Sequence, residues 1–186
     1  MAHSAPGSLS VLIKKLSYRE GDFTLASGKK SKFYIDLKAT TLHPEGAYQI
    51  GLAAIAKLKQ SDMKIEGVGG LTLGADPIAT AVSLAARAEG LHWPAYIVRK
   101  EPKDHGTARY VEGTENLKPG ASLLVLEDVV TSGGSSIKAV ERLREAGYKP
   151  VAVLTVVDRE EGGRAAIEAL GIKLIALTTF KEIQGA

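Results

Sequence analysis

Short apolar runs alternate with helical patterns along most of this sequence, and this alternation restricts the possible folds more than any other feature. Runs typical of buried strands occupy residues 65–70, 95–100, 122–130, 151–158 and 173–180. Apolar periodicity predicts helices at 43–60, 76–90, 135–147 and 163–171, with Pro44 near the start of the first. Because parallel strands are joined through crossover helices, we expect an α/β fold whose central, mostly parallel sheet is flanked by helices.

The residues before this alternating region differ from it. Residues 21–38 are rich in β-forming side chains on both sides of Ser27-Gly28, which predicts a hairpin with its turn there. No internal repeat, low-complexity tract or linker interrupts the 186 residues. The length suits one domain with a sizeable core, so we expect a single domain over residues 1–186.

Composition excludes several classes of function. The chain contains no cysteine, which rules out disulfides, thiolate metal sites and cysteine nucleophiles and favours a cytoplasmic protein. No apolar run reaches the roughly 18 residues of a membrane helix, and the first residues lack a secretory signal. The formal net charge of +3 is too small to indicate nucleic-acid binding, although it suits a small anionic substrate.

The most informative stretch is the strand at 122–130 and the loop that follows it. Four aliphatic residues precede Glu127 and Asp128, and a Thr131–Ser135 loop of small residues leads into a helix. Such a loop exposes backbone N–H groups that bind anions. Ionised carboxylates only accept hydrogen bonds, so the two acids suit sugar hydroxyls. Together these features predict a ribose 5-phosphate site, whereas the loop alone fits equally well an ordinary helix N-cap at Ser135 or Ser136.

A second stretch, residues 98–113, concentrates positive charge. Arg99, Lys100, Lys103 and His105 lie within seven residues, and the segment then becomes polar and glycine-containing. We interpret it as a mobile lid over an anionic leaving group, because positioned cations stabilise developing charge best where water is excluded. The alternative is a solvated surface loop.

These motifs resemble those of a known family. The segment VLEDVVTSGGS is similar to the signature with which type I phosphoribosyltransferases bind phosphoribosyl pyrophosphate (PRPP), and RKEPKDHG resembles the catalytic loop of orotate phosphoribosyltransferases. Residues 21–38, 69–82 and 156–163 resemble three further segments of that family. The match runs in order from about residue 8 to the C-terminus, so the sequence is identified as a member of the bacterial single-domain type.

The resemblance implies a reaction and a set of roles. Orotate and PRPP would give orotidine 5′-monophosphate and pyrophosphate, with Mg²⁺ on the pyrophosphate, in pyrimidine biosynthesis. It also implies a homodimer that shares the catalytic loop, and a small hood built from about residues 1–40 and the C-terminal segment. Lys103, His105 and Asp128 would be catalytic. PRPP would be bound by Arg99, Lys100, Lys103, His105, Glu127, Asp128, Val129, Val130, Thr131, Ser132, Gly133, Gly134 and Ser135.

Orotate would be bound by Thr131 and Arg159, since a planar guanidinium suits its carboxylate. Without the resemblance, Arg159 is also readily explained as a surface arginine paired with Glu160 or Glu161. Many members have lysine where this chain has Ala26, which puts one PRPP contact in doubt. The alternatives that remain are a purine or uracil phosphoribosyltransferase and a non-catalytic PRPP-binding regulator.

Overall fold

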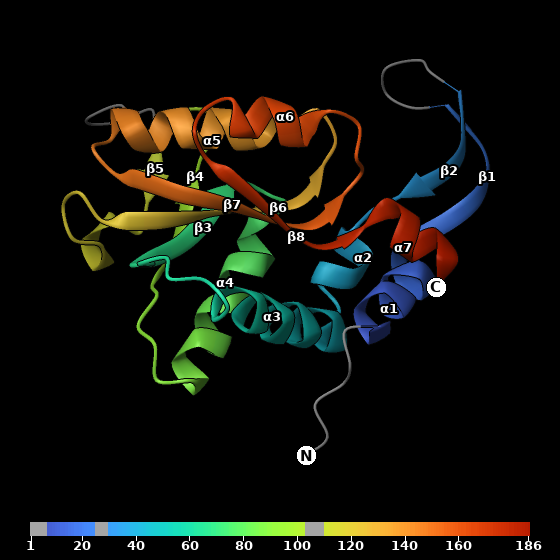
Figure 1. Cartoon of the computed structure of the whole chain (residues 1–186), viewed down its shortest axis with the longest axis horizontal. Helices are drawn as coiled ribbons and strands as arrows, with labels where there is room; N and C mark the ends of the chain where they lie inside the picture. The colour runs from blue at the N-terminus through green and yellow to red at the C-terminus, as the bar shows by residue number, and fades with distance from the viewer. Residues whose placement is uncertain (1–6, 25–29, 103–109) are drawn as a thin grey trace.

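The computed structural model of the protein describes residues 7–24, 30–102 and 110–186, and in this part of the chain the main sheet has six strands (Figure 1). Their order across the sheet is β5-β4-β3-β6-β7-β8, and every neighbouring pair is parallel except β4 and β5. The predicted mostly parallel sheet is therefore confirmed. The strands are β3 (Gly67–Leu71), β4 (Ala95–Val98), β5 (Val111–Glu112), β6 (Ser122–Val130), β7 (Lys149–Asp158) and β8 (Lys173–Thr179).

Helices cover both faces of this sheet. Figure 1 shows α3 (Pro44–Leu58) and α4 (Ala75–Ala88) on one face, and α5 (Gly134–Glu145) and α6 (Gly163–Glu168) on the other. Along β6, Leu124 and Leu126 pack in the core beneath α3 and α4, while Leu123 and Val125 pack in the core beneath α5 and α6. Burial on both faces explains why residues 123–126 of β6 form a continuous apolar run rather than an alternating one.

The two ends of the chain come together beside the sheet. Strands β1 (Tyr18–Thr24) and β2 (Lys30–Ile35) form the expected antiparallel hairpin, and α1 (Gly7–Ser17) and α7 (Phe180–Gly185) lie next to it (Figure 1). The ring of Phe33 lies 4.4 Å from that of Phe180, and Tyr18 joins both. The side chain of Ser10 is hydrogen-bonded to that of Thr178 at 2.8 Å. These contacts join the hairpin to the C-terminal segment.

Several short elements were not predicted. Besides α1 and α7, they are α2 (Lys38–Thr41), β5 and a 3₁₀ turn at Thr114–Asn116. The last strand was predicted to include Phe180, but it ends at Thr179. There, the Thr179 hydroxyl accepts a hydrogen bond from the Glu182 amide, and the Glu182 carboxylate accepts one from the Thr179 amide. This capping box starts α7 at Phe180.

The strand order places a crevice at a predictable position. From β3 the chain crosses to β4 on one side, and it later enters β6 on the other side of β3. In open parallel sheets, ligands bind beyond the carboxyl ends of the strands at such a reversal. The segments after β3, β4, β6 and β7 all lie at this edge.

Within the described residues, no helix has the length and apolarity needed to cross a bilayer.

Candidate active site

Glu127 is the most deeply placed ionisable group at the end of β6. Glu127 is only 6% exposed, and its Oε2 accepts a hydrogen bond of 3.1 Å from the Ser136 hydroxyl on α5. Burial raises the pKa of Glu127 to about 8, and the neighbouring Asp128 adds to this by charge repulsion and by accepting a hydrogen bond. The two carboxyl groups are thus close enough to influence each other, as expected for acids that serve one site.

Asp128 lies against the segment after β3. A side-chain carbon added at Gly74 would come within 2.8 Å of three carboxyl atoms of Asp128, so only glycine lets this backbone approach the acid. In the same segment the peptide bond between Thr72 and Leu73 is cis. The Thr72 hydroxyl donates a 2.6 Å hydrogen bond to Oδ2 of Asp76, whose Oδ1 is buried and has no hydrogen-bond partner. The segments after β3 and β6 therefore meet at the predicted crevice.

The loop after β6 forms a hollow at the N-terminus of α5. The hollow has a volume of about 260 Å³ and is open to solvent. Gly133 precedes the helix with φ +85°, a conformation that favours glycine, and no side chain caps the first turn. The N–H groups of that turn have no partner within the helix, so they are available to an anion. The hollow is lined by Glu127, Val129, Val130, Thr131, Ser132, Gly133, Gly134, Ser135 and Ser136.

Helix α6 holds this loop in place. The Gly163 amide donates a 2.9 Å hydrogen bond to the Thr131 carbonyl. A side-chain carbon on Gly163 would lie 2.5 Å from Cγ1 of Val130 and 2.6 Å from the Thr131 oxygen. Gly133 in turn lies close to the Gly163 backbone and to Ile167. The loop conformation thus depends on a close backbone contact between the start of α5 and the start of α6.

Part of the predicted cationic cluster lies at the end of β4. Arg99 is half-buried and forms a 3.3 Å ion pair with Glu112, and Lys100 is exposed. The backbone amide of Arg99 donates a 2.8 Å hydrogen bond to the Tyr110 carbonyl, extending the β4–β5 pairing by one step. Lys103 and His105, together with Ala26 of the hairpin turn, lie outside the described residues.

Arg159 lies at the end of β7, facing the aromatic cluster. Its guanidinium carbon is 5.5 Å from the ring centroid of Phe33 and 5.7 Å from that of Phe180. An ion pair of 2.6 Å joins Arg159 to Glu161, one of the pairings expected for a surface arginine. The side chain is nevertheless only 16% exposed, and its Nε is buried with no hydrogen-bond partner. A buried donor of this kind is uncommon and indicates that a ligand can complete its hydrogen bonding.

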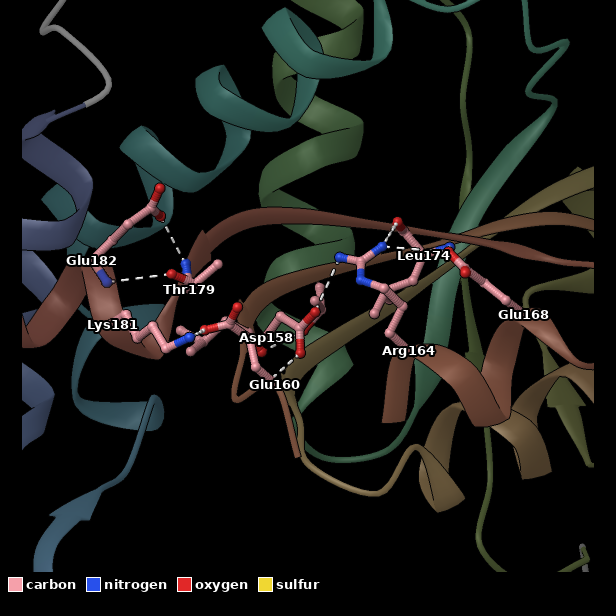
Figure 2. A network of polar contacts seen from close by, with 10 residues as sticks. Asp158, Glu160, Arg164, Glu168, Leu174, Thr179, Lys181 and Glu182 are labelled. Carbon is pink, nitrogen blue, oxygen red and sulfur yellow. Dashed lines mark hydrogen bonds and ion pairs between the residues drawn. The ribbon is translucent and has the colours of Figure 1, made fainter. Parts of the chain in front are cut away.

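The turn that carries Arg159 is shaped by Asp158. Figure 2 shows Asp158 between the Glu160 backbone and Arg164. Its Oδ1 accepts a 2.8 Å hydrogen bond from the Glu160 amide, and its Oδ2 pairs with Arg164 at 3.0 Å. Glu160 also pairs with Lys181 of α7 at 3.6 Å. Asp158 is buried, so these contacts fix the turn and with it the start of the Arg159 side chain.

Sequence reasoning missed some residues of this site. Ser136 was considered only as a helix cap, whereas its hydroxyl bonds Glu127. Gly74 and Gly163 are required by close approaches of segments that are distant in sequence. Phe33 was not among the predicted site residues; it packs against the core and also lies beside Arg159. A glycine after a predicted strand was the only available signal for Gly74.

Comparison with known proteins agrees with this geometry. No protein-family model matches the sequence. The orotate phosphoribosyltransferase of a Nostoc strain is 49% identical over 173 residues, covering 93% of this chain and 82% of that protein. The orotate phosphoribosyltransferase of Aquifex aeolicus is 47% identical over 94% of this chain and 95% of its own.

Solved structures extend the likeness to the fold. The Mycobacterium tuberculosis orotate phosphoribosyltransferase in complex with PRPP superposes with a TM-score of 0.80 and 34% identity, over 96% of this chain and 98% of that one. The sheet, the hollow and these relatives lead to the same conclusion. The chain has the type I phosphoribosyltransferase fold and belongs to the orotate phosphoribosyltransferases.

Proposed function

We propose that this protein transfers the ribose 5-phosphate group of PRPP to orotate, giving orotidine 5′-monophosphate and pyrophosphate in pyrimidine biosynthesis. The observation that carries the proposal is the hollow lined by Glu127 and by the uncapped N-terminus of α5, with the carboxyl group of Asp128 next to that of Glu127. Hydroxyl donors and a terminal phosphate are the two groups that such a hollow accommodates together.

The ribose and its phosphate would divide this hollow between them. Glu127 and Asp128 would accept hydrogen bonds from the ribose hydroxyls. The amides and hydroxyls of residues 131–135 would surround the 5′-phosphate, whose charge is favoured by the α5 dipole. Val129 and Val130 would contribute backbone and apolar contacts at the strand end.

The pyrophosphate would lie between the segments after β3 and β4. Arg99, Lys100, Lys103 and His105 supply positive charge there, and the backbone at 72–76 supplies polar groups. At about 4 Å, one pair of unit charges is worth about 1 kcal/mol in water but about 4 kcal/mol at an effective dielectric of 20. The cations would therefore contribute most to catalysis where the departing pyrophosphate is shielded from water.

Orotate would lie against Arg159. Its carboxylate would replace Glu161 on the guanidinium and would also bring an acceptor to the unpartnered Nε. Phe33 and Phe180 would keep water away from this ion pair. Thr131 would reach the base from the opposite side of the hollow. The orotate ring nitrogen can already be anionic, so alignment and charge stabilisation would account for most of the rate.

Magnesium fits this arrangement as a companion of the substrate. Mg²⁺ prefers oxygen ligands and commonly keeps waters and substrate phosphates in its shell. Among the described residues no three His, Cys, Asp or Glu side chains converge on a metal position. Asp128 offers a half-buried carboxylate, so the pyrophosphate and water would supply most of the remaining ligands. The ion would supply positive charge to the leaving group.

A homodimer is also part of the proposal, as is a cytoplasmic location. Among the described residues, several large apolar side chains on or next to α2, α3 and α4 are exposed to solvent. They are Leu42, Tyr48, Leu73 and Leu84, which are 60–71% exposed. A second copy of the chain would bury them. We expect no nucleic-acid or membrane partner.

A panel of acceptor bases tests the proposed reaction. Pyrophosphate release is followed with PRPP and Mg²⁺ in the presence of orotate, uracil, hypoxanthine or adenine. We expect release with orotate alone, because only orotate carries a carboxylate for Arg159. Activity confined to a purine or to uracil would replace the acceptor assignment. No release with any base, accompanied by tight PRPP binding, would favour the non-catalytic regulator.

A further inference from the structure

Arg142 on α5 is a buried cation that bonds the backbone at the end of β4. It is 8% exposed, and among the described residues no other lysine or arginine is buried. Its Nη1 donates to the carbonyl oxygen of Arg99, and its Nη2 donates to that of Lys100 at 2.7 Å. A buried guanidinium must satisfy its donors, and here two backbone carbonyls in succession do so.

The same guanidinium also contacts the other end of the cationic segment. Its carbon lies 3.9 Å from the ring centroid of Tyr110, within the range of a cation–π interaction. Tyr110 is joined to Arg99 through the backbone hydrogen bond of 2.8 Å. Arg142 therefore touches both the point where the chain leaves β4 and the point where it returns to β5.

Arg142 belongs to α5, whose first turn borders the hollow that is the proposed site of the 5′-phosphate. From Gly134 to Arg142 is eight residues, which corresponds to about 12 Å of helix. We propose that Arg142 is a positioning residue, which uses α5 as a rigid spacer to hold Arg99 and Lys100 at a fixed distance from the 5′-phosphate site. This rests on the proposed function, in which Arg99 and Lys100 bind the pyrophosphate of the same substrate molecule.

Packing alone does not explain this arrangement. Beside Arg142 lies a hollow of about 490 Å³, which is also lined by Tyr110, Thr114 and Tyr148. Since protein atoms do not fill that side, the guanidinium is held chiefly by its two carbonyl acceptors and the ring. A planar fork of donors reaches two adjacent carbonyls, whereas a lysine ammonium is a point donor that cannot reproduce both bonds in the same geometry.

The test compares Arg142→Met and Arg142→Lys with wild type, and Arg144→Met is the matched control. Arg144 lies on the same helix and donates a 2.9 Å hydrogen bond to the Leu170 carbonyl, away from β4. We expect Arg142→Met to lower kcat/KM for PRPP at least 10-fold while the Kd for orotidine 5′-monophosphate, which lacks the pyrophosphate, stays within 2-fold. Arg142→Lys should recover part of the loss, and Arg144→Met should resemble wild type in both measurements.

Either of two results would overturn the proposal. One is an unchanged kcat/KM for PRPP in Arg142→Met. The other is an equal loss of affinity for the mononucleotide, which would mean general damage to α5. If Arg142→Met does not fold, Arg142→Lys takes its place: a smaller loss of kcat/KM for PRPP with an unchanged Kd for orotidine 5′-monophosphate supports the proposal, and an unchanged kcat/KM or an equal loss in both overturns it.

A readout independent of activity separates this inference from the proposed function. Tryptic cleavage after Arg99 and Lys100 should be at least 5-fold faster in Arg142→Met than in Arg144→Met. Equal cleavage rates would refute the positional contact even if the protein proved active on orotate. A wild type that is inactive with orotate would refute the proposed reaction, and the cleavage comparison would still decide whether Arg142 holds the segment.

Discussion

At the scale of single residues, Glu127 links stability to pH. Its pKa in the folded protein is about 8, against an ordinary value of 4.5. Between these values the folded protein holds a proton that the unfolded chain has lost. The free energy of unfolding therefore falls as pH rises, by up to about 1.4 kcal/mol per pH unit from this group. The contribution is complete below pH 4.5 and is lost as pH rises through 8.

Urea unfolding of wild type and Glu127→Gln at pH 5.5 and pH 7.5 measures this effect. We expect wild type to lose stability between the two values and the glutamine variant to lose distinctly less, because the amide does not titrate. The same slope in both proteins would mean that Glu127 is ionised in the folded state across this range. In that case, burial would not control its charge.

Arg159 gives a prediction about substrate discrimination. In Arg159→Lys the bidentate donor is lost, which typically costs about 1.5–3 kcal/mol for a hydrogen bond to a charged group. The KM for orotate should therefore rise by about 10-fold or more, while the KM for PRPP changes little. Arg87→Lys, an exposed substitution on α4, is the control. Equal increases in both KM values would argue against a specific contact with the base.

At the scale of elements, the contact between the starts of α5 and α6 is the most sensitive to small changes. Gly163→Ala would place a carbon 2.5 Å from Val130 and 2.6 Å from the Thr131 carbonyl, so the loop after β6 must shift. We expect at least a 10-fold weaker Kd for orotidine 5′-monophosphate by calorimetry. Gly185→Ala, where an added carbon meets nothing within 4 Å, should bind as wild type does. Unchanged binding in Gly163→Ala would show that the loop tolerates displacement.

The cationic segment after β4 gives a kinetic prediction. Lys103→Ala should lower kcat by about 100-fold, the typical effect of removing one donor that stabilises transition-state charge. PRPP affinity should fall much less, because the charge of the pyrophosphate grows as it departs. Rapid-quench rates and PRPP binding on the same preparation separate the two. An unaltered kcat would remove Lys103 from a catalytic role.

Elements with strong local signals could be predicted from the sequence. Strand β6 was predicted with its observed limits, because an apolar run broken only by Glu127 and Asp128 ends abruptly at a glycine-rich loop. Strand β5 has two residues and is formed only because β4 offers an edge, so no periodicity could reveal it. Helix α7 depends on the Thr179–Glu182 capping box, which was overlooked beside the apolar run of β8.

The site was predictable to a similar degree. Residues that are continuous in sequence, such as Glu127 and residues 129–135, lie together around one hollow. Contacts between distant segments were not foreseen, because they depend on the packing of whole elements. The approach of Gly74 to Asp128 and the bonds from Arg142 to the Arg99 and Lys100 carbonyls are both of this kind.

At the scale of the whole molecule, assembly is the feature to test. If the exposed apolar side chains on or next to α2, α3 and α4 form a dimer interface, Leu84→Lys should convert the protein from dimer to monomer, as measured by light scattering. Val11→Lys replaces a comparably exposed residue on α1 and should leave the mass unchanged. A monomeric wild type would remove the homodimer, and a dimeric Leu84→Lys would move the interface elsewhere.

The joining of the chain ends has consequences for the base site. Phe180 of the C-terminal helix and Phe33 of the hairpin both lie near the Arg159 guanidinium, so the proposed orotate end of the site would depend on both ends of the chain. The proposed ribose end would depend on the sheet and on the contact between the starts of α5 and α6. In the proposed function, the molecule would therefore combine a sugar-binding edge with a base-binding wall assembled from segments distant in sequence.

The most direct test of this account is a crystal structure with orotidine 5′-monophosphate bound. We predict that the phosphate lies at the amides of residues 132–135, that the ribose hydroxyls donate to Glu127 and Asp128, and that the base carboxylate pairs with Arg159. A nucleotide bound elsewhere, with the hollow at the start of α5 empty, would contradict the account.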